Sequence, residues 1–332
     1  MSDPTQVAPL LGQPLGRLIG VSLGPGDPGL ITRRAWALLE RRDTVWTYPR
    51  RSTKSPSYAF DIVSRSELLP PENHQALLFP MTHDEAKLLR HWHRAADTVL
   101  PLLQAGTDVL FLVEGDASTY ATFGHLSRTV RALDARIRAE IVPGVNSFTA
   151  ACATLDLPLA EQDDTVAIVP AAYGVSAVDR LLPDFDTLVL LKVKPLVDEL
   201  IDWLERRGLL GHTQFIERCG APDERVVTDL LSLRGQPVSY LSLMIVKNPH
   251  RVRGERVRGC LKKASAPSAA VIDSTEQEEE NACATSRSAS TPSALRRASS
   301  SSRSPSTARL KPPSWRVRCP RQASASRPSS PR

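Results

Sequence analysis

The chain has 332 residues, enough for two domains with hydrophobic cores, and a formal net charge of +6. Residues 264–332 hold 11 of the 42 Lys and Arg and 5 of the 36 Asp and Glu, so residues 1–263 carry 31 of each sign. A neutral body lacks the basic footprint of a nucleic-acid-binding domain, and we expect no nucleic-acid partner.

The cysteines and the absence of export signals indicate a cytoplasmic protein. The cysteine count is odd and no C-x-x-C pair occurs, which favours a reducing compartment and no metal site. Residues 1–16 lack the features of a signal peptide, and no apolar stretch approaches the roughly 20 residues of a membrane span. We therefore expect no membrane partner. The cysteines are Cys152, Cys219, Cys260, Cys283 and Cys319.

Residues 17–46 have the pattern of a strand, a glycine-rich turn, a helix and a second strand. The apolar run 18–23 is typical of a buried parallel strand, and residues 24–29, Gly-Pro-Gly-Asp-Pro-Gly, must turn. Residues 30–42 have an apolar helical face opposite a face of arginines, and residues 44–48 form the next strand. This order predicts an α/β fold with its ligand at the carboxyl ends of the strands.

Residues 24–29 also match the G-x-G-x-x-G pattern of dinucleotide-binding turns. Pro25 and Pro28 have no N–H groups to offer a pyrophosphate, and the Asp27 carboxylate would repel it. The next strand ends in basic residues rather than in the acidic residue that binds a ribose. Those basic residues could accept the 2′-phosphate of NADP, so an NADP-dependent oxidoreductase stays open as an alternative.

Two more strand–turn–helix junctions follow. The strand 108–113 runs into the turn 114–120, where we expect Asp116 or Ser118 to cap a helix over 120–133. Residues 141–147 form the third junction, ahead of an Ala-rich helix over 148–155. Three junctions with Gly and Pro or Asp at one sheet edge are hard to explain by packing alone, and they indicate a ligand site.

The remaining pattern predicts a second α/β block and a tail. We expect a flexible segment 1–15, an N-terminal domain 16–143, a C-terminal domain 144–263 and a low-complexity tail 264–332. The tail is rich in Ser, Ala, Pro and Arg and is expected to be disordered, with binding of nucleic acid as an alternative. This composition is also typical of a GC-rich gene that is read out of frame, a hypothesis that an intact mass would test. Further helices are expected over 58–64, 83–104 and 196–207, and further strands over 77–80, 165–169, 187–193, 214–218, 225–228 and 240–246.

Together the junctions resemble the motifs of the tetrapyrrole methylase family, at residues 20–28, 114–116 and 142–147. Within the family, the closest resemblance is to the precorrin-2 C20-methyltransferases of cobalamin biosynthesis. It extends over residues 16–262 and rests on residues 79–82, 91–92, 108–116, 120–126 and 240–248.

The resemblance implies two α/β domains with S-adenosylmethionine in a cleft between them, in a homodimer. It also implies transfer of a methyl group to C20 of precorrin-2, which gives precorrin-3A. Where the family has proline after the aspartate of the second turn, this chain has Ala117. The positions that correspond to the family's cofactor-binding residues are Pro25, Gly26, Gly115, Asp116, Ala117, Ser118, Thr119, Tyr120, Asn146, Ser147, Lys192, Val193 and Ala221.

A methyl transfer of this kind needs alignment and exclusion of water rather than a nucleophilic side chain, and the sequence identifies no catalytic base. Precorrin-2 carries many carboxylates, so basic groups at strand ends are candidates to bind it. These candidates are Arg50, Arg51, Lys54 and His83. Each of them could equally be an ordinary solvated side chain.

Several alternatives stay open. The same fold could methylate cobalt-factor II, another ring carbon, an RNA ribose or a modified histidine, or the protein could be a non-enzymatic binder. Asp116 could be no more than a helix cap. Glu114 and Asp116 could form an acid–base pair, an alternative that we do not favour. His91 and His93 diverge on a helix, which argues against a metal pair.

Overall fold

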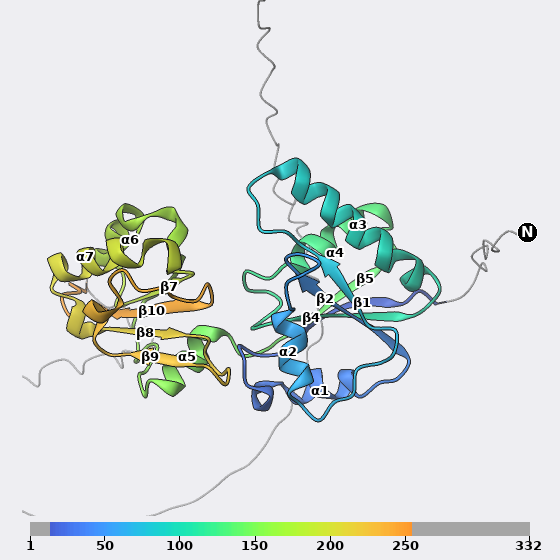
Figure 1. The fold of residues 1–332 in the computed structure, drawn as a ribbon, viewed down its shortest axis with the longest axis horizontal. Helices are drawn as coiled ribbons and strands as arrows, with labels where there is room; N and C mark the ends of the chain where they lie inside the picture. Colours follow the sequence, from blue (N-terminus) through green and yellow to red (C-terminus); the bar gives the residue numbers. More distant parts are fainter. Residues whose placement is uncertain (1–13, 254–332) are drawn as a thin grey trace, which may run out of the picture. The chain divides into compact units, whose positions relative to one another are not determined.

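The computed structural model describes residues 14–253. The predicted flexible segment 1–15 lies almost entirely outside this range, as do the predicted tail and three of the five cysteines, Cys260, Cys283 and Cys319. Within the range, the chain forms two β-sheets with helices on their faces (Figure 1). The predicted α/β fold class with two sheets is confirmed.

The first sheet is entirely parallel, with strand order β3-β2-β4-β1-β5. Its two central strands, β4 and β1, are buried along almost their whole length, as their continuous apolar runs predict. Parallel strands all present their carboxyl ends at one edge, so the segments that follow β1, β4 and β5 meet there. The strands are β1 (Arg17–Ser22), β2 (Thr44–Arg50), β3 (Gln75–Leu78), β4 (Asp108–Val113) and β5 (Arg138–Val142).

Helices cover both faces of this sheet, α3 and α4 on one and α1 and α2 on the other (Figure 1). Strand alternation divides the core accordingly: in β4, Phe111 packs with α3 and α4, while Leu110 and Leu112 pack with α1 and α2. The helices are α1 (Arg33–Leu39), α2 (Tyr58–Ser64), α3 (Glu85–Gln104) and α4 (Phe123–Leu133).

The second sheet is mixed, with strand order β6-β7-β10-β8-β9. Only β6 and β7 are parallel, and β10 runs antiparallel between β7 and β8. The start of β10 therefore lies beside the carboxyl ends of β7 and β8, with Leu243 opposite Leu191 and Ser242 opposite Glu217. The strands are β6 (Val166–Pro170), β7 (Thr187–Leu191), β8 (Thr213–Glu217), β9 (Arg225–Val227) and β10 (Ser242–Lys247).

Helices α6 and α7 pack on one face of the second sheet and α5 on the other (Figure 1). Helix α5 follows β5 and packs on the second sheet, and a domain division near Pro143 stays a prediction. These helices are α5 (Ser147–Thr154), α6 (Val175–Leu181) and α7 (Val197–Arg207). The 3₁₀ turns are η1 (Pro28–Leu30), η2 (Ala171–Tyr173), η3 (Leu182–Asp184), η4 (Lys194–Leu196), η5 (Leu210–His212) and η6 (Leu230–Leu233).

The first helix is shorter than the pattern predicts. Residues 28–30 form a 3₁₀ turn, capped by the Asp27 carboxylate, which accepts from the Gly29 N–H at 2.8 Å. The α-helix begins only at Arg33, where the Thr32 hydroxyl accepts from the Ala35 N–H. Ile31 and Thr32 are both extended, with ψ of 122° and 150°, so the predicted start at residue 30 is wrong.

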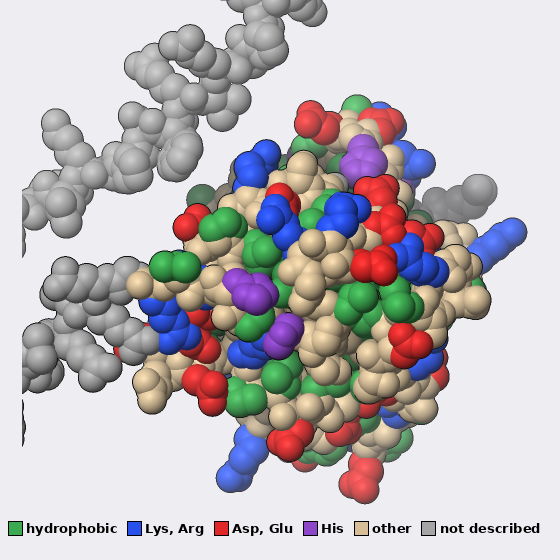
Figure 2. Space-filling model, turned by 90° about the vertical axis from the view of Figure 1, so that its left-hand side faces the viewer, with side chains coloured by type: hydrophobic (Ala, Val, Ile, Leu, Met, Phe, Trp, Pro, Cys, Tyr) green, Lys and Arg blue, Asp and Glu red, His purple; other side chains and the backbone are tan. Residues whose placement is uncertain are grey.

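Surface charge agrees with the neutral composition. On the face in Figure 2, Lys and Arg side chains are interspersed with Asp and Glu side chains and form no patch of one sign. Among the helices of residues 14–253, none is long and apolar enough to cross a membrane.

Candidate active site

Backbone hydrogen bonds join the first two junctions directly. The Gly24 N–H donates to the Gly115 carbonyl at 3.2 Å, and the Gly115 N–H donates to the Gly24 carbonyl at 2.7 Å. Both glycines have positive φ, +77° and +70°, a conformation that costs glycine little. The turns after β1 and β4 therefore form one paired unit.

The third junction is joined to this unit through Ser22, the last residue of β1. The buried Ser22 hydroxyl donates to the Val142 carbonyl at 2.6 Å and accepts from the Ala117 N–H at 2.8 Å. One side chain thus links the ends of β1, β5 and β4. Sequence patterning alone places Ser22 within an apolar strand and gives no sign of this role.

Asp116 makes a second link. Its carboxylate accepts from the Gly144 N–H at 2.8 Å through one oxygen, and from the Ser118 N–H at 2.8 Å and the Ser118 hydroxyl through the other. Burial raises the pKa of Asp116, but hydrogen bonds from Ser118, Gly144 and Thr119 outweigh burial and hold the pKa below its ordinary value. The carboxylate is therefore ionised at neutral pH.

The predicted helix cap at Asp116 or Ser118 is wrong. Helix α4 begins at Phe123, its N-cap is Thr122, and no side-chain hydrogen bond caps it. Asp116 lies several residues upstream and instead joins two loops that are distant in sequence. This long-range contact is invisible to a local pattern.

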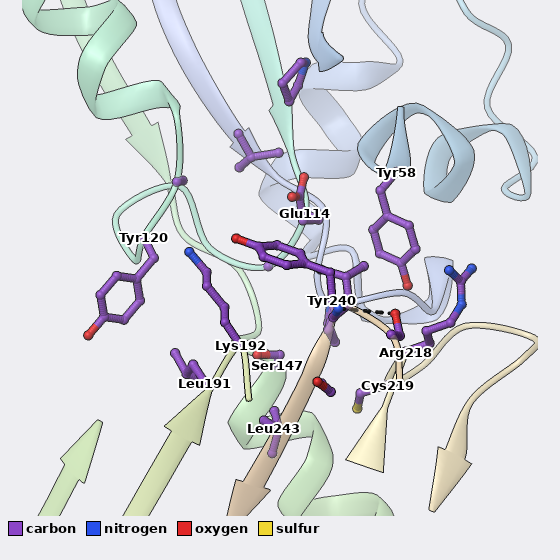
Figure 3. Close-up of a pocket in the computed structure, with 18 of the residues that line it drawn as sticks. Tyr58, Glu114, Tyr120, Ser147, Leu191, Lys192, Arg218, Cys219, Tyr240 and Leu243 are labelled. Atoms are coloured by element: carbon purple, nitrogen blue, oxygen red, sulfur yellow. Dashed lines mark hydrogen bonds between the residues drawn. The ribbon is translucent and has the colours of Figure 1, made fainter. Parts of the chain in front are cut away.

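A cavity of about 700 Å³ lies at the joined junctions and is lined by residues of both sheets (Figure 3). It includes most of the predicted cofactor positions and two of the predicted substrate positions. These residues are Pro25, Gly115, Asp116, Thr119, Tyr120, Asn146, Ser147 and Lys192, and, for the substrate, Arg50 and Arg51.

The other predicted positions do not line the cavity. Gly26 packs so closely on the second-sheet loop that an added Cβ would lie 2.5 Å from the Cys219 carbonyl oxygen. Val193 is fully buried in the core of the second sheet. The remaining predicted positions outside the lining are Ala117, Ser118 and Ala221, and, for the substrate, Lys54 and His83.

Backbone strain concentrates at the cavity. Tyr120, Lys192 and Arg218 all line it and have φ of +52°, +58° and +54°. Such values are unfavourable for residues with a Cβ and tend to occur at functional sites. Hydrogen bonds from the Lys192 N–H to the Ser242 carbonyl and from the Arg218 N–H to the Leu241 carbonyl hold two of these residues in place.

The lining residues that were not predicted from the sequence include Tyr58, Arg218, Tyr240 and Ser242. Tyr58 opens α2, and the other three lie where β8 ends and β10 begins. The signal for them is topological, because an antiparallel β10 places its start at the same edge as the ends of its neighbours. Without the strand order, the sequence does not reveal this.

Two of these residues offer unsatisfied polar atoms. The Ser242 hydroxyl and the Tyr58 hydroxyl are both buried and have no hydrogen-bond partner within the described residues. Burial raises the pKa of Tyr58 to about 12, so this phenol is neutral. Buried polar atoms without partners are uncommon and are suited to bind a ligand.

The backbone at Gly115 is open to a ligand such as S-adenosylmethionine. At Gly115 the direction of a Cβ is open, with no atom within 4 Å, so a ligand can approach the backbone closely there. A nucleophilic thiol is not offered: burial, followed by the nearby Glu224, raises the pKa of Cys219 to about 12. Nor does any group of three His, Cys, Asp or Glu suited to a metal occur in residues 14–253.

Comparisons with known proteins agree with this architecture. The family model described as Tetrapyrrole (Corrin/Porphyrin) Methylases matches residues 17–233. The cobalt-precorrin-2 C(20)-methyltransferase of Salmonella typhimurium is 30% identical over 232 residues, which is 70% of this chain and 96% of that protein. The precorrin-2 C(20)-methyltransferase of a Sinorhizobium species is 28% identical over 243 residues, 71% of this chain and 96% of that protein.

Among solved structures, the cobalamin biosynthetic enzyme cobalt precorrin-4 methyltransferase superposes with a TM-score of 0.53. It is 21% identical in sequence, and the match covers 70% of this chain and 94% of that one, which supports the fold alone. From the match of the family model across both sheets and from these relatives, the chain belongs to the tetrapyrrole methylase family.

Proposed function

We propose that the protein transfers a methyl group from S-adenosylmethionine to C20 of precorrin-2 and so forms precorrin-3A in cobalamin biosynthesis. Membership of the methylase family supports the reaction type, and the names of the two relatives support the ring position. An NADP-dependent oxidoreductase is not favoured, because the first turn holds Pro25, Asp27 and Pro28 where a pyrophosphate needs N–H donors.

The observation that carries the proposal is the junction of three strand ends around one cavity. Its volume of about 700 Å³ is within the range of small-molecule sites. Gly24 and Gly115 are paired through their backbones, and Ser22 and Asp116 attach the third junction. Such a rigid assembly can hold two reactants in line, which is the main requirement of the transfer.

Within this cavity, the residues that would hold the cofactor are Pro25, Gly115, Asn146 and Ser147. S-adenosylmethionine supplies an activated methyl group that departs from a neutral thioether. The protein then has to bind the macrocycle against the cofactor and exclude water, and it needs no nucleophile of its own. The raised pKa of Cys219, which keeps its thiol protonated, is consistent with a reaction that needs no protein nucleophile.

Whether the ring already holds cobalt separates two versions of the proposal. One relative is named for precorrin-2 and the other for cobalt-precorrin-2, and both have similar identity to this chain. Another ring carbon stays a further alternative. The homodimer and the cytoplasmic location stay predictions of the resemblance and of the sequence.

The test is an anaerobic incubation of the full chain with S-adenosylmethionine and either precorrin-2 or its cobalt-containing counterpart. The proposal predicts one added methyl group on precorrin-2, assigned to C20 by NMR. Product from the cobalt-containing ring alone would move the protein to the cobalt-dependent route. Binding of S-adenosylmethionine without product from either ring would refute the substrate and leave the fold assignment intact.

A further inference from the structure

Of the four tyrosine–cation contacts on the lining of the cavity, three involve Tyr120 or Tyr240. The Lys192 ammonium lies 5.8 Å from the centre of the Tyr120 ring and 5.9 Å from that of Tyr240, and Figure 3 shows it directed between the two rings. The Arg51 guanidinium lies 5.5 Å from the same Tyr240 ring. Tyr240 is thus flanked by two cations from different sheets, one after β2 and one after β7.

Neither cation has an anionic partner in the described part of the chain. In residues 14–253, Arg51 and Lys192 form no ion pair, and no hydrogen bond involves their side-chain nitrogens. A guanidinium or ammonium held over a ring keeps its N–H donors free for a carboxylate. The backbone of Lys192 is held in place, since it has a φ of +58° and its N–H donates to the Ser242 carbonyl at 2.9 Å.

The charge balance of the lining points to an anionic ligand. Of the carboxylates that line the cavity, Asp61 pairs with Arg65, Asp116 is used by the turns, and Glu114 has no partner in the described range. Against Glu114 stand four cations that have no carboxylate partner among the described residues, Arg50, Arg51, Lys192 and Lys194, of which Arg50 donates to the Ser55 carbonyl at 2.6 Å. S-adenosylmethionine itself has a net positive charge, so the cofactor does not account for this excess.

We propose that Arg51 and Lys192, held on the two sides of the cavity around Tyr240, bind carboxylate side chains of the tetrapyrrole, with the ring system against Tyr240. The inference rests on the proposed function and adds the residues that recognise the substrate. It also reassigns Lys192, which the family resemblance places at the cofactor. Several separate cations suit a flat ligand with carboxylates at its edge.

The test measures binding without methyl transfer. Uroporphyrin III, a stable porphyrin with a carboxylate on every side chain, is titrated into the full chain and followed by tyrosine and tryptophan fluorescence. Arg51→Met and Lys192→Met are each expected to weaken binding about tenfold and to reduce its salt dependence. Lys87→Met and Arg90→Met, at exposed cations of α3 outside the cavity, are the matched controls and should bind as the unmodified chain does.

Lys192→Gly guards against a folding defect. Glycine adopts positive φ without strain, so this variant removes the ammonium and should keep or raise the melting temperature while binding uroporphyrin as weakly as Lys192→Met. Coproporphyrin III, which has half as many carboxylates, should respond less to either Met variant.

Three results would overturn the inference: no binding of uroporphyrin by the unmodified chain, binding by both Met variants as tight as by the unmodified chain, or a Lys192→Met variant that loses S-adenosylhomocysteine and not uroporphyrin. The last result would return Lys192 to the cofactor. If both variants lose uroporphyrin but precorrin-2 is not methylated, the proposed function fails and this binding site stands. If precorrin-2 is methylated and the variants bind uroporphyrin normally, the proposed function stands and this binding site fails.

Discussion

A substitution at Gly115 can separate the stability of the joined turns from the binding of the cofactor. Gly115 has a φ of +70°, lines the cavity, and has no atom within 4 Å of the place where a Cβ would be. Replacement by alanine therefore adds a methyl group into open space that the proposal assigns to the cofactor. Gly208, which ends α7, is a matched control with a φ of +68° and equally open surroundings.

The structure predicts equal costs in stability and unequal costs in binding. A non-glycine residue in the left-handed conformation costs about 1 kcal/mol at either site. In a folded body of this size, that loss lowers the melting temperature by about 2–4 °C. Only Gly115→Ala should also weaken S-adenosylhomocysteine, by about tenfold, which corresponds to about 1.4 kcal/mol of binding free energy.

Calorimetric titration and thermal melts of the two variants and the unmodified chain test this. The reasoning predicts matched melting temperatures for the two variants and reduced S-adenosylhomocysteine affinity for Gly115→Ala alone. Unchanged affinity in Gly115→Ala would show that the cofactor does not approach this turn. A loss of affinity in both variants would show that binding reports general destabilisation.

In denaturant titrations, Asp116→Asn should lower the unfolding free energy by about 1–2 kcal/mol, because an amide has one acceptor oxygen and the carboxylate uses two. The control is Asp84→Asn, which should be nearly neutral because the Asp84 carboxylate caps α3 through one oxygen. For Asp108, burial raises the pKa, but hydrogen bonds from two arginines outweigh burial and lower the pKa to about 2. The ionised Asp108 therefore stabilises the fold fully above about pH 4, and this stabilisation is lost as the pH falls towards 2. Asp108→Asn should remove about 2 kcal/mol of stability at neutral pH and flatten the stability profile in that window; an unchanged profile would contradict this. Gly26→Ala should lower the unfolding free energy by about 1–3 kcal/mol, because its Cβ would lie 2.5 Å from a carbonyl oxygen. The control Gly211→Ala, whose Cβ would have no described atom within 4 Å, should be about as stable as the unmodified chain. Equal melting temperatures of the two variants would refute the close packing at residue 26.

Elements with strong local signals were predictable from the sequence. The strand Asp108–Val113 and the helix Tyr58–Ser64 have the predicted bounds. A continuous apolar run defines the strand, and Ser57 caps the helix by accepting from the Phe60 N–H. Such features depend on a few neighbouring residues, so a pattern contains them.

Features that depend on distant contacts were not predictable. Helix α6, Val175–Leu181, was missed, because it is short and its N-cap, Gly174, provides no side-chain cap. Helix α3 contains Pro101 and continues beyond it to Gln104. Ser22 and Asp116 join strands that are distant in sequence, which requires the sheet order.

The sequence predicted the turns that form the candidate site, but it predicted fewer of the side chains that line the cavity. The three glycine-containing turns identify the edge of the sheet because each has an unusual local composition. Tyr240 and Arg218 enter the cavity only because β10 is antiparallel to β7 and β8. The sequence cannot show which strands are neighbours, and so it could not show these two residues.

The proposed reaction is the transfer of a methyl group to C20. It is tested most directly by mass spectrometry of enzymatically generated precorrin-2 after anaerobic incubation with the full chain and S-adenosylmethionine. We expect a product heavier by one methyl group, with the new methyl carbon bonded to C20 in the NMR spectrum. Methylation at another carbon, or recovery of unmodified precorrin-2 and of its cobalt-containing counterpart from a chain that binds S-adenosylmethionine, would contradict the proposed reaction.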